Sequence, residues 1–338
     1  MHTNEHERRR RRSGNYVWSL AKRTRRPKPL RQEPATLLAR IITTAGTGTS
    51  PDVVVRIITE QLSREWGQQV TVENNSTGAG IVAAQQVTGA PPDGYTLLLA
   101  SASAFTVLPI RHERAPTVVG THLEPIAFLG ELPMAYAVSA KLGVKSIKEL
   151  IDLSKREPDK IFYAANATGT LPHLAGEYFK SRTGASLTFV PFRGTADALA
   201  GVLSGQINAI VENYVTLAGA IQSGDLVLLG FSSKQRLPNF PDVPTLAETL
   251  PGFVAIGWAA LAAPTGIPEQ VVQKINADVR KAFDKPDVRK RLIDLGNYPV
   301  SMSTTELTGF IRQEQDQWTP VVRSILAGAS AAPTGAKK

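Results

Sequence analysis

Short apolar runs and longer amphipathic segments alternate along most of the chain. The run RIITT at 40–44 predicts a strand. In the segment that follows it, Val53, Ile57 and Leu62 fall on one helical face, which predicts a helix ending at Gly67. The chain therefore opens with a strand, a loop and a helix.

The same order recurs further along. Apolar runs predict strands at 69–74, 95–101 and 207–213. Two further strand-then-helix units are expected at 160–184 and 187–205, and the last third of the chain is expected to be mostly helical. Strands that alternate with helices of this length predict parallel sheets with helices on both faces, which is an α/β fold.

Three of the predicted strand-to-helix loops are rich in small residues: GTGTSPD at 46–52, NNSTGAGI at 74–81 and NATGTLPHL at 166–174. In open α/β sheets, ligands bind beyond the carboxyl ends of the strands. The free N–H groups at a helix start favour an anion there. One such loop is typical of an ordinary turn, but three on separate units favour a binding cleft.

The same loops predict where two helices start and exclude one class of anion, the nucleotides. Ser50 or Asp52 is expected to cap the first helix, and Thr170 the helix after the third loop. Pro51 stands where the third glycine of a dinucleotide-binding fingerprint would be, and no phosphate-binding P-loop motif occurs. No nucleotide and no other cofactor are therefore expected.

Candidate catalytic groups do not assemble into a known motif. The chain has no cysteine, and no metalloprotease or nucleophile-elbow motif occurs, so neither catalytic residues nor a metal site are expected. His112 and His122 are expected at the surface. His173 could pack or cap a helix, or line the cleft. Arg193 could contact a ligand or form an ion pair.

The net charge of +9 is concentrated at the N-terminus. Residues 1–40 hold 12 of the 38 Lys and Arg residues but 3 of the 29 acids, so the rest of the chain is neutral. Residues 1–37 are expected to be a disordered basic arm. Three interpretations of the arm stay open: an annotation artefact, a degenerate twin-arginine-like leader, and a nucleic-acid-binding arm. No apolar stretch approaches the roughly 20 residues of a membrane-spanning helix.

An ordered series of segments resembles the Bug family, the extracytoplasmic receptors of tripartite tricarboxylate transporters. The series runs from about residue 40 to about residue 325 and comprises DVVVRI, WGQQVTVENNSTGAG, PPDGYTLLLAS, SIKELI, TGTLPHLAGEYFKSRTG, VPFRGTADALAGVLSGQINAI, LPNFPDVPTLAET and GWAALAAPTGIPEQVVQKIN. Any one of these segments is weak evidence for the resemblance, but the whole series in this order is specific to the family.

The resemblance implies a type II periplasmic-binding-protein-like fold, with two α/β lobes around a central ligand cleft that closes like a Venus flytrap. We expect one lobe at 38–135 plus 255–326, the other at 136–254, and a disordered tail at 327–338. The two crossovers between the lobes are expected near 131–140 and 251–258.

The resemblance also implies the binding residues. One loop contributes Thr47, Gly48 and Thr49. The loop of the opposite lobe contributes Thr168, Gly169 and Thr170, and the wall contributes Gly78 and Ala79. We add three residues at the predicted cleft: Ser101, His173 and Arg193.

This chain departs from the family pattern at several positions. Ala45 replaces an aromatic residue and Thr49 a glycine, so the ligand preference is expected to differ. Gly201 and Asn208 stand where relatives often carry Asp.

Two functions follow. The first is a noncatalytic, periplasmic, monomeric solute receptor that binds a di- or tricarboxylate, an aromatic carboxylate or an amino acid, and delivers it to membrane transporter subunits, without nucleic acid. The alternative is an intracellular effector-sensing protein that uses its basic arm on nucleic acid.

Overall fold

The computed structural model of the chain describes residues 39–112 and 115–331. The basic arm predicted at 1–37 and the end of the predicted tail, 332–338, lie outside the described residues. The described residues belong to one compact unit, Leu37–Lys338. No helix in the described ranges is long and apolar enough to cross a membrane.

The first lobe is built around three parallel strands, with β1 in the middle between β2 and β3. Helices follow each strand, as the alternating pattern predicts. The elements of this part are β1 (Ala39–Thr43), α1 (Ser50–Trp66), β2 (Val70–Asn74), the 3-10 helix η1 (Thr77–Gly80), α2 (Ile81–Thr88), β3 (Thr96–Ser101), α3 (Ala102–Thr106) and α4 (Leu108–Arg111).

The second lobe repeats this arrangement, with β5 between β6 and β7 in parallel register. Its elements are η2 (Ala140–Leu142), α5 (Ile147–Arg156), β5 (Ile161–Ala165), α6 (Leu171–Thr183), β6 (Leu187–Pro191), α7 (Thr195–Leu203), β7 (Ala209–Asn213), α8 (Tyr214–Gln222), β8 (Leu226–Phe231) and α9 (Leu246–Thr249).

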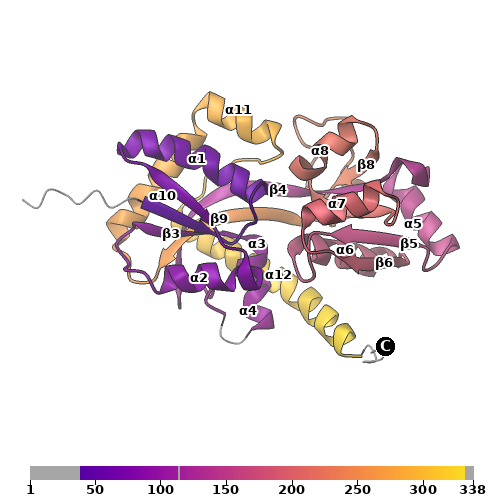
Figure 1. Cartoon of the computed structure of the whole chain (residues 1–338), viewed down its shortest axis with the longest axis horizontal. Coiled ribbons are helices and arrows are strands. Elements are labelled where there is room, and N and C mark those ends of the chain that lie inside the picture. Colours follow the sequence, from indigo (N-terminus) through magenta and orange to yellow (C-terminus); the bar gives the residue numbers. More distant parts are fainter. Residues whose placement is uncertain (1–38, 113–114, 332–338) are drawn as a thin grey trace, which may run out of the picture. The chain divides into compact units, whose positions relative to one another are not determined.

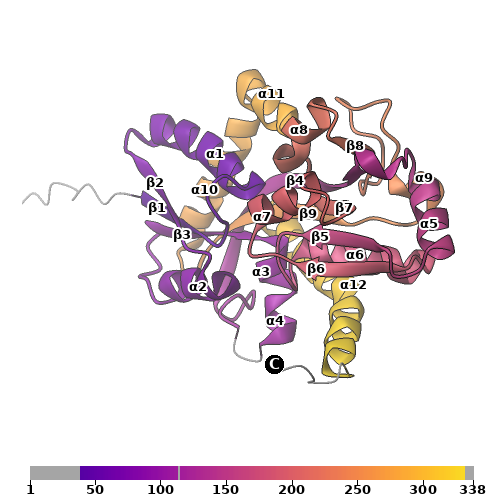
Figure 2. The same ribbon diagram turned by 45° about the vertical axis from the view of Figure 1, so that its right-hand side comes forward.

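Two strands run between the lobes: β4 (Leu123–Ser139) and β9 (Ile256–Pro264). The strand β4 pairs with β9 as far as Pro133 and with β7 from Met134 onward. In both ribbon views β4 and β9 pass from the group β1–β3 to the group β5–β8 (Figures 1 and 2). Both are antiparallel to their partners, so the predicted parallel pairing holds within β1–β3 and β5–β7 but not for the two strands that join the lobes. The two-lobed α/β fold is confirmed, whereas the predicted lobe boundaries stay a prediction.

Three helices complete the chain: α10 (Glu269–Phe283), α11 (Pro286–Asp294) and α12 (Thr304–Ala331). Apolar side chains of α1 and α10, among them Ile58, Leu62 and Val279, are buried in one cluster with the strands β1 and β3. Full burial of a side chain of this size contributes about 1.5–3 kcal/mol. The 3.6-residue spacing seen in the sequence is therefore the spacing of the buried face.

Two predictions about helix ends need correction. The helix α1 begins at Ser50 and has Thr49 at its N-cap, so neither Ser50 nor Asp52 caps it. Its end at Gly67, with φ 63, is confirmed. The tail predicted to be disordered from residue 327 is helical as far as Ala331, where it continues α12.

Candidate functional site

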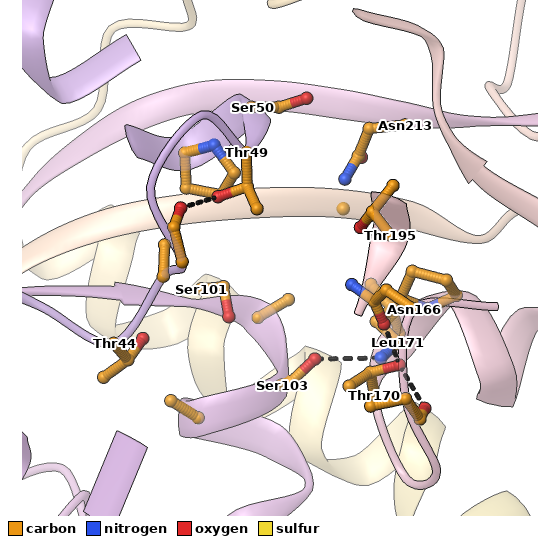
Figure 3. Close-up of a pocket in the computed structure, with 18 of the residues that line it drawn as sticks. Thr44, Thr49, Ser50, Ser101, Ser103, Asn166, Thr170, Leu171, Thr195 and Asn213 are labelled. Atoms are coloured by element: carbon orange, nitrogen blue, oxygen red, sulfur yellow. Dashed lines mark hydrogen bonds between the residues drawn. The ribbon is translucent and has the colours of Figure 1, made fainter. Parts of the chain in front are cut away.

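A cavity of about 390 Å³ lies where the carboxyl ends of β1, β3, β5 and β7 meet the starts of α1, α3, α6 and α7. We call residues 44–49 the first loop and residues 166–170 the second loop. In Figure 3, Thr44, Thr49 and Ser101 lie on one side of this space, and Asn166, Thr170 and Thr195 lie on the other. A cavity of this volume fits a small organic ligand.

The first loop is held by side chains within its own lobe. Thr49 Oγ1 donates to the Gly46 carbonyl at 2.7 Å, and the Gly48 amide donates to Asp52 Oδ2 at 2.9 Å. Asp52 also accepts from Asn74 Nδ2 at 2.7 Å and forms an ion pair with Arg56. Burial alone would raise the pKa of Asp52, but the hydrogen bonds from these partners outweigh it and lower the pKa.

The second loop is organised by the helix that follows it. Thr170 Oγ1 lies 2.6 Å from Asn166 Oδ1 and 2.7 Å from the Ala167 carbonyl oxygen, and its single hydrogen is shared between these two acceptors. The Gly169 amide donates to His173 Nδ1 at 3.0 Å. His173 is 4% exposed, and its ring lies 4.0 Å from that of Phe189. Burial lowers the pKa of His173 to about 4, so the ring stays a neutral acceptor.

The N-termini of both helices face the cavity. Thr49, Ser50 and Pro51 of α1 line it, as do Thr170 and Leu171 of α6. Within the described part of the chain, no side chain of the N-cap residue accepts a hydrogen bond at either helix. The Leu171 amide at the start of α6 donates to a side chain outside the helix, Ser103. The N-terminal turns of two helices that face the same space create a positive potential there.

The residues predicted for the site fall into two groups. Six of them line the cavity: Thr49, Ser101, Thr168, Gly169, Thr170 and Arg193. Four others do not: Thr47, Gly48, Gly78 and His173. The first three of these four are exposed, and His173 lies behind the second loop. The side chain of the remaining predicted residue, Ala79, lies outside what the structure describes.

Two residues that the resemblance assigns to ligand binding have backbone amides that already have partners within the protein. The Gly48 amide donates to Asp52, and the Gly169 amide donates to His173. In this arrangement both amides hold their own loops in shape.

Several lining residues were not predicted from the sequence, notably Ser103, Arg111, Glu212 and Asn213. Arg111 lies at the end of α4, directly before His112, which was expected at the surface, and its sequence neighbourhood carries no signal for a site. Glu212 could have been noticed, because a carboxylate inside an apolar strand such as INAIVEN needs a reason to be buried.

Ser103 and Arg111 connect the first lobe to the second loop. The Leu171 amide at the start of α6 donates to Ser103 Oγ at 2.8 Å (Figure 3). A β-carbon at Gly169 would lie 2.1 Å from Arg111 Nη1, so the guanidinium rests against the glycine backbone. Arg111 and Arg193 therefore place two cations at the cavity, and neither has an ion-pair partner among the described residues.

Glu212, on β7, is the acidic residue of the cavity wall and is 1% exposed. It accepts from Thr195 Oγ1 at 3.1 Å, from the Asn213 amide at 2.9 Å and from Asn213 Nδ2 at 3.1 Å. Burial raises the pKa of Glu212 to about 7, although these hydrogen bonds act in the opposite direction.

The departures from the family pattern lie in two places. Ala45 and Thr49 line the cavity, whereas Gly201 and Asn208 do not. A β-carbon at Gly201 would lie 2.6 Å from the ring of Phe192, so an aspartate there would collide with it. Asn208 accepts a hydrogen bond from the Phe162 amide at 2.8 Å. These two positions therefore affect packing outside the cavity.

No group of three or more metal-ligating residues occurs in the part of the chain that the structure describes. His112 is exposed, and the ring nitrogen Nδ1 of His122 is buried without a partner in the described ranges. The chemistry of the cavity is that of hydrogen-bond donors, two arginines and one buried carboxyl group.

Comparison with known proteins agrees with this architecture. Residues 54–326 match the sequence model of the tripartite tricarboxylate transporter family receptor. Protein BugT of Bordetella pertussis is 33% identical over 282 residues, which cover 82% of this chain and 85% of BugT. A second relative, a UPF0065 protein of Bordetella bronchiseptica, is 30% identical over 285 residues, covering 84% of each chain.

Solved structures of similar fold cover almost all of the body. Rpa4515 of R. palustris, solved with adipate, has a TM-score of 0.80 and 25% identity, covering 85% of this chain and 96% of that one. MatC of Rhodopseudomonas palustris, solved with bound malate, has a TM-score of 0.74 and 29% identity, covering 84% and 98%. The periplasmic binding protein BugD has a TM-score of 0.75 and 28% identity, covering 85% and 96%.

Proposed function

The chain belongs to the family of tripartite tricarboxylate transporter receptors, and we propose that it binds a small carboxylate in the cavity between its lobes for delivery to a membrane transporter. Two structural relatives were solved with the carboxylates adipate and malate. The comparisons give no support to the alternative of an effector-sensing protein that binds nucleic acid.

One observation carries the proposal: the N-termini of α1 and α6 face a single cavity from opposite lobes. A carboxylate between them accepts hydrogen bonds from both lobes at once, so its binding favours the closed arrangement of the lobes. Arg111 and Arg193 concentrate positive charge at the cavity of a body that is neutral overall.

The magnitudes fit a receptor. Hydrogen bonds to a charged group contribute roughly 1.5–3 kcal/mol each. Four of them supply about 6–12 kcal/mol, which ordering and association oppose by about 4–15 kcal/mol. Apolar burial against Leu132, Met134 and Trp258 in the cavity wall supplies part of the remainder. A micromolar dissociation constant needs about 8 kcal/mol.

We propose that the protein is noncatalytic. Around the cavity, His173 serves the second loop as a buried neutral acceptor, and Glu212 is occupied by three protein donors. A general base must reach the proton that it removes, and neither group is free to do so in this arrangement.

The proposal is tested by isothermal titration and thermal-shift measurements with dicarboxylates, tricarboxylates, aromatic carboxylates and amino acids. At least one acid is expected to bind and raise the melting temperature. Arg193→Ala should weaken that binding by about tenfold, the loss of one charge-assisted contact. Arg312→Ala removes an exposed arginine of α12 outside the cavity and should have no effect.

If no small acid stabilises the protein, the receptor proposal is wrong. If Arg193→Ala and Arg312→Ala changed the ligand affinity equally, the binding site would not be this cavity.

We further propose that the protein is periplasmic and monomeric, and that its lobe boundaries lie near residues 135 and 255. Cell fractionation of the full chain tests the location, and light scattering tests the monomer. Co-purification with transporter membrane subunits, dependent on the bound acid, tests the delivery step. Recovery in the cytoplasmic fraction would exclude this role.

A further inference from the structure

One hydrogen bond joins the first lobe directly to the second across the cavity. The Leu171 amide, in the first turn of α6, donates to Ser103 Oγ of α3 at 2.8 Å, and Figure 3 draws this bond between the two helices. Both residues line the cavity, and Ser103 is partly exposed. The bond joins two protein groups on opposite lobes, so it requires no ligand, and separation of the two helices breaks it.

A second contact between the lobes lies beside the first. The guanidinium group of Arg111, at the end of α4, rests against the backbone of Gly169, two positions before Leu171. The first lobe therefore touches the start of α6 at two adjacent points. We call Ser103 and Arg111 of the first lobe, together with Gly169 and Leu171 of the second, the interlobe contact.

Helix α12 holds both sides of the interlobe contact in place. Gln315 Nε2 of α12 donates to the carbonyl of Phe105 in α3 at 2.7 Å, and Phe105 is buried. Helix α12 also packs against α6, where the ring of Trp318 lies 6.0 Å from that of Tyr178. Because neither α3 nor α6 has to be ordered when the lobes meet, closing the interlobe contact costs little conformational entropy.

A direct contact between lobes changes the ratio of closed to open molecules before a ligand binds. One hydrogen bond shifts such a ratio by about three- to tenfold. A ligand that touches both lobes binds the closed form, so its apparent affinity is proportional to the closed fraction of the free protein. Ser103 can therefore change the affinity through the position of the lobes.

We propose that Ser103 is a positioning residue that keeps the lobes closed in the ligand-free protein, so that opening is the step that admits and releases the ligand. This inference rests on the proposed function and adds to the same cavity a device that sets how often it opens. The Ser103 hydroxyl acts through the Leu171 amide, which it holds against the first lobe.

The first test measures the distance between the lobes in the free protein. The chain has no cysteine, so spin labels on Lys155→Cys of α5 and Gln270→Cys of α10, both exposed, attach only at these two sites in opposite lobes. Electron–electron resonance should show mainly one distance. Adding Ser103→Ala should raise the population of a second distance relative to the first by about three- to tenfold.

Two further variants separate this role from a general structural effect. Ser103→Thr keeps a hydroxyl acceptor for the Leu171 amide and should restore the original distances. Ser181→Ala is the matched control, because Ser181 also lies on α6 and bonds to the Tyr178 carbonyl at 2.8 Å, but it is exposed and outside the cavity. It should leave the distances unchanged.

The second test measures binding kinetics by stopped-flow tryptophan fluorescence, since Trp258 lines the cavity. The probes are succinate, citrate, benzoate and glutamate, one from each class of acid. For any probe that binds, Ser103→Ala should release it about three- to tenfold faster without slower association, because opening is easier. Ser103→Thr should release it at the original rate.

The outcomes distinguish this inference from the receptor proposal. Unchanged distances in free Ser103→Ala, or an equal shift in Ser181→Ala, overturn the inference and leave the receptor proposal standing. Tighter binding by Ser103→Ala also overturns it, since the hydroxyl would then compete with the ligand for the Leu171 amide. Shifted distances without binding of any acid support the interlobe contact and overturn the receptor proposal.

Discussion

The guanidinium group of Arg111 lies so close to the backbone of Gly169 that a β-carbon there would stand 2.1 Å from Arg111 Nη1. Gly169 has φ 78, a conformation that also disfavours a side chain. Glycine at this position therefore serves two purposes: it allows the turn of the second loop, and it lets an arginine of α4 reach the start of α6.

Gly169→Ala should displace Arg111 and weaken carboxylate binding by about tenfold, because one charge-assisted contact is lost. The matched control is Gly143→Ala, which has φ 73 but no atom within 4 Å of the new β-carbon. Both variants should lose roughly 1 kcal/mol of stability from backbone strain. Equal ligand affinities in titration would show that the contact with Arg111 does not matter for binding.

Asp52→Ala should loosen the first loop. It removes the acceptor of the Gly48 amide, of Asn74 Nδ2 and of Arg56, and Asp52 is 2% exposed, so we expect a loss of about 2–3 kcal/mol. Asp152→Ala removes a similarly spaced ion pair with Lys148, but at an exposed site where solvent screens the charges, and should change the stability much less. Urea unfolding curves of the two variants measure the difference, and similar losses would contradict this account of the loop.

His173 should make the protein less stable as the pH falls from about 6.5 to about 4. The unfolded chain binds a proton on this histidine near pH 6.5, whereas the folded protein resists it down to about 4. The unfolded state then holds more protons, so the free energy of unfolding decreases with decreasing pH. His173→Gln keeps an acceptor for the Gly169 amide and should reduce this loss by on the order of 2 kcal/mol. An unchanged pH dependence in urea unfolding would exclude His173 as the source.

Glu212 should make the protein less stable as the pH rises, which is the opposite of the effect of His173. Its carboxyl group gives up its proton near pH 4.5 in the unfolded chain but near pH 7 in the folded protein. The unfolded state holds fewer protons in this window, so stability is greatest below it and declines as the pH rises through it. Glu212→Gln should be more stable than the unmodified protein at about pH 8, by on the order of 2 kcal/mol. A less stable variant at that pH would mean that the charged carboxylate is needed to hold Thr195 and Asn213 in place.

The local pattern of apolar and polar residues was sufficient to predict the alternating strands and helices. Helix α1 ends at Gly67 as predicted, because glycine adopts the left-handed conformation of a helix end at little cost. The loops at the carboxyl ends of β1 and β5 were also located from the sequence, since small residues and prolines mark them directly. Six of the residues proposed from these loops and strand ends do line the cavity.

The sequence by itself thus determined the alternation of strands and helices and the small loops before α1 and α6, because these depend on neighbouring residues. Only the tertiary structure decided which groups meet in the cavity. Arg111 and Glu212 are 101 positions apart in the numbering and reach the same space only because β4 and β9 join the lobes. Hydrogen bonds likewise decided that His173 supports the second loop from behind and that Glu212 is held by Thr195 and Asn213. Such contacts depend on packing between distant segments, which no local periodicity encodes.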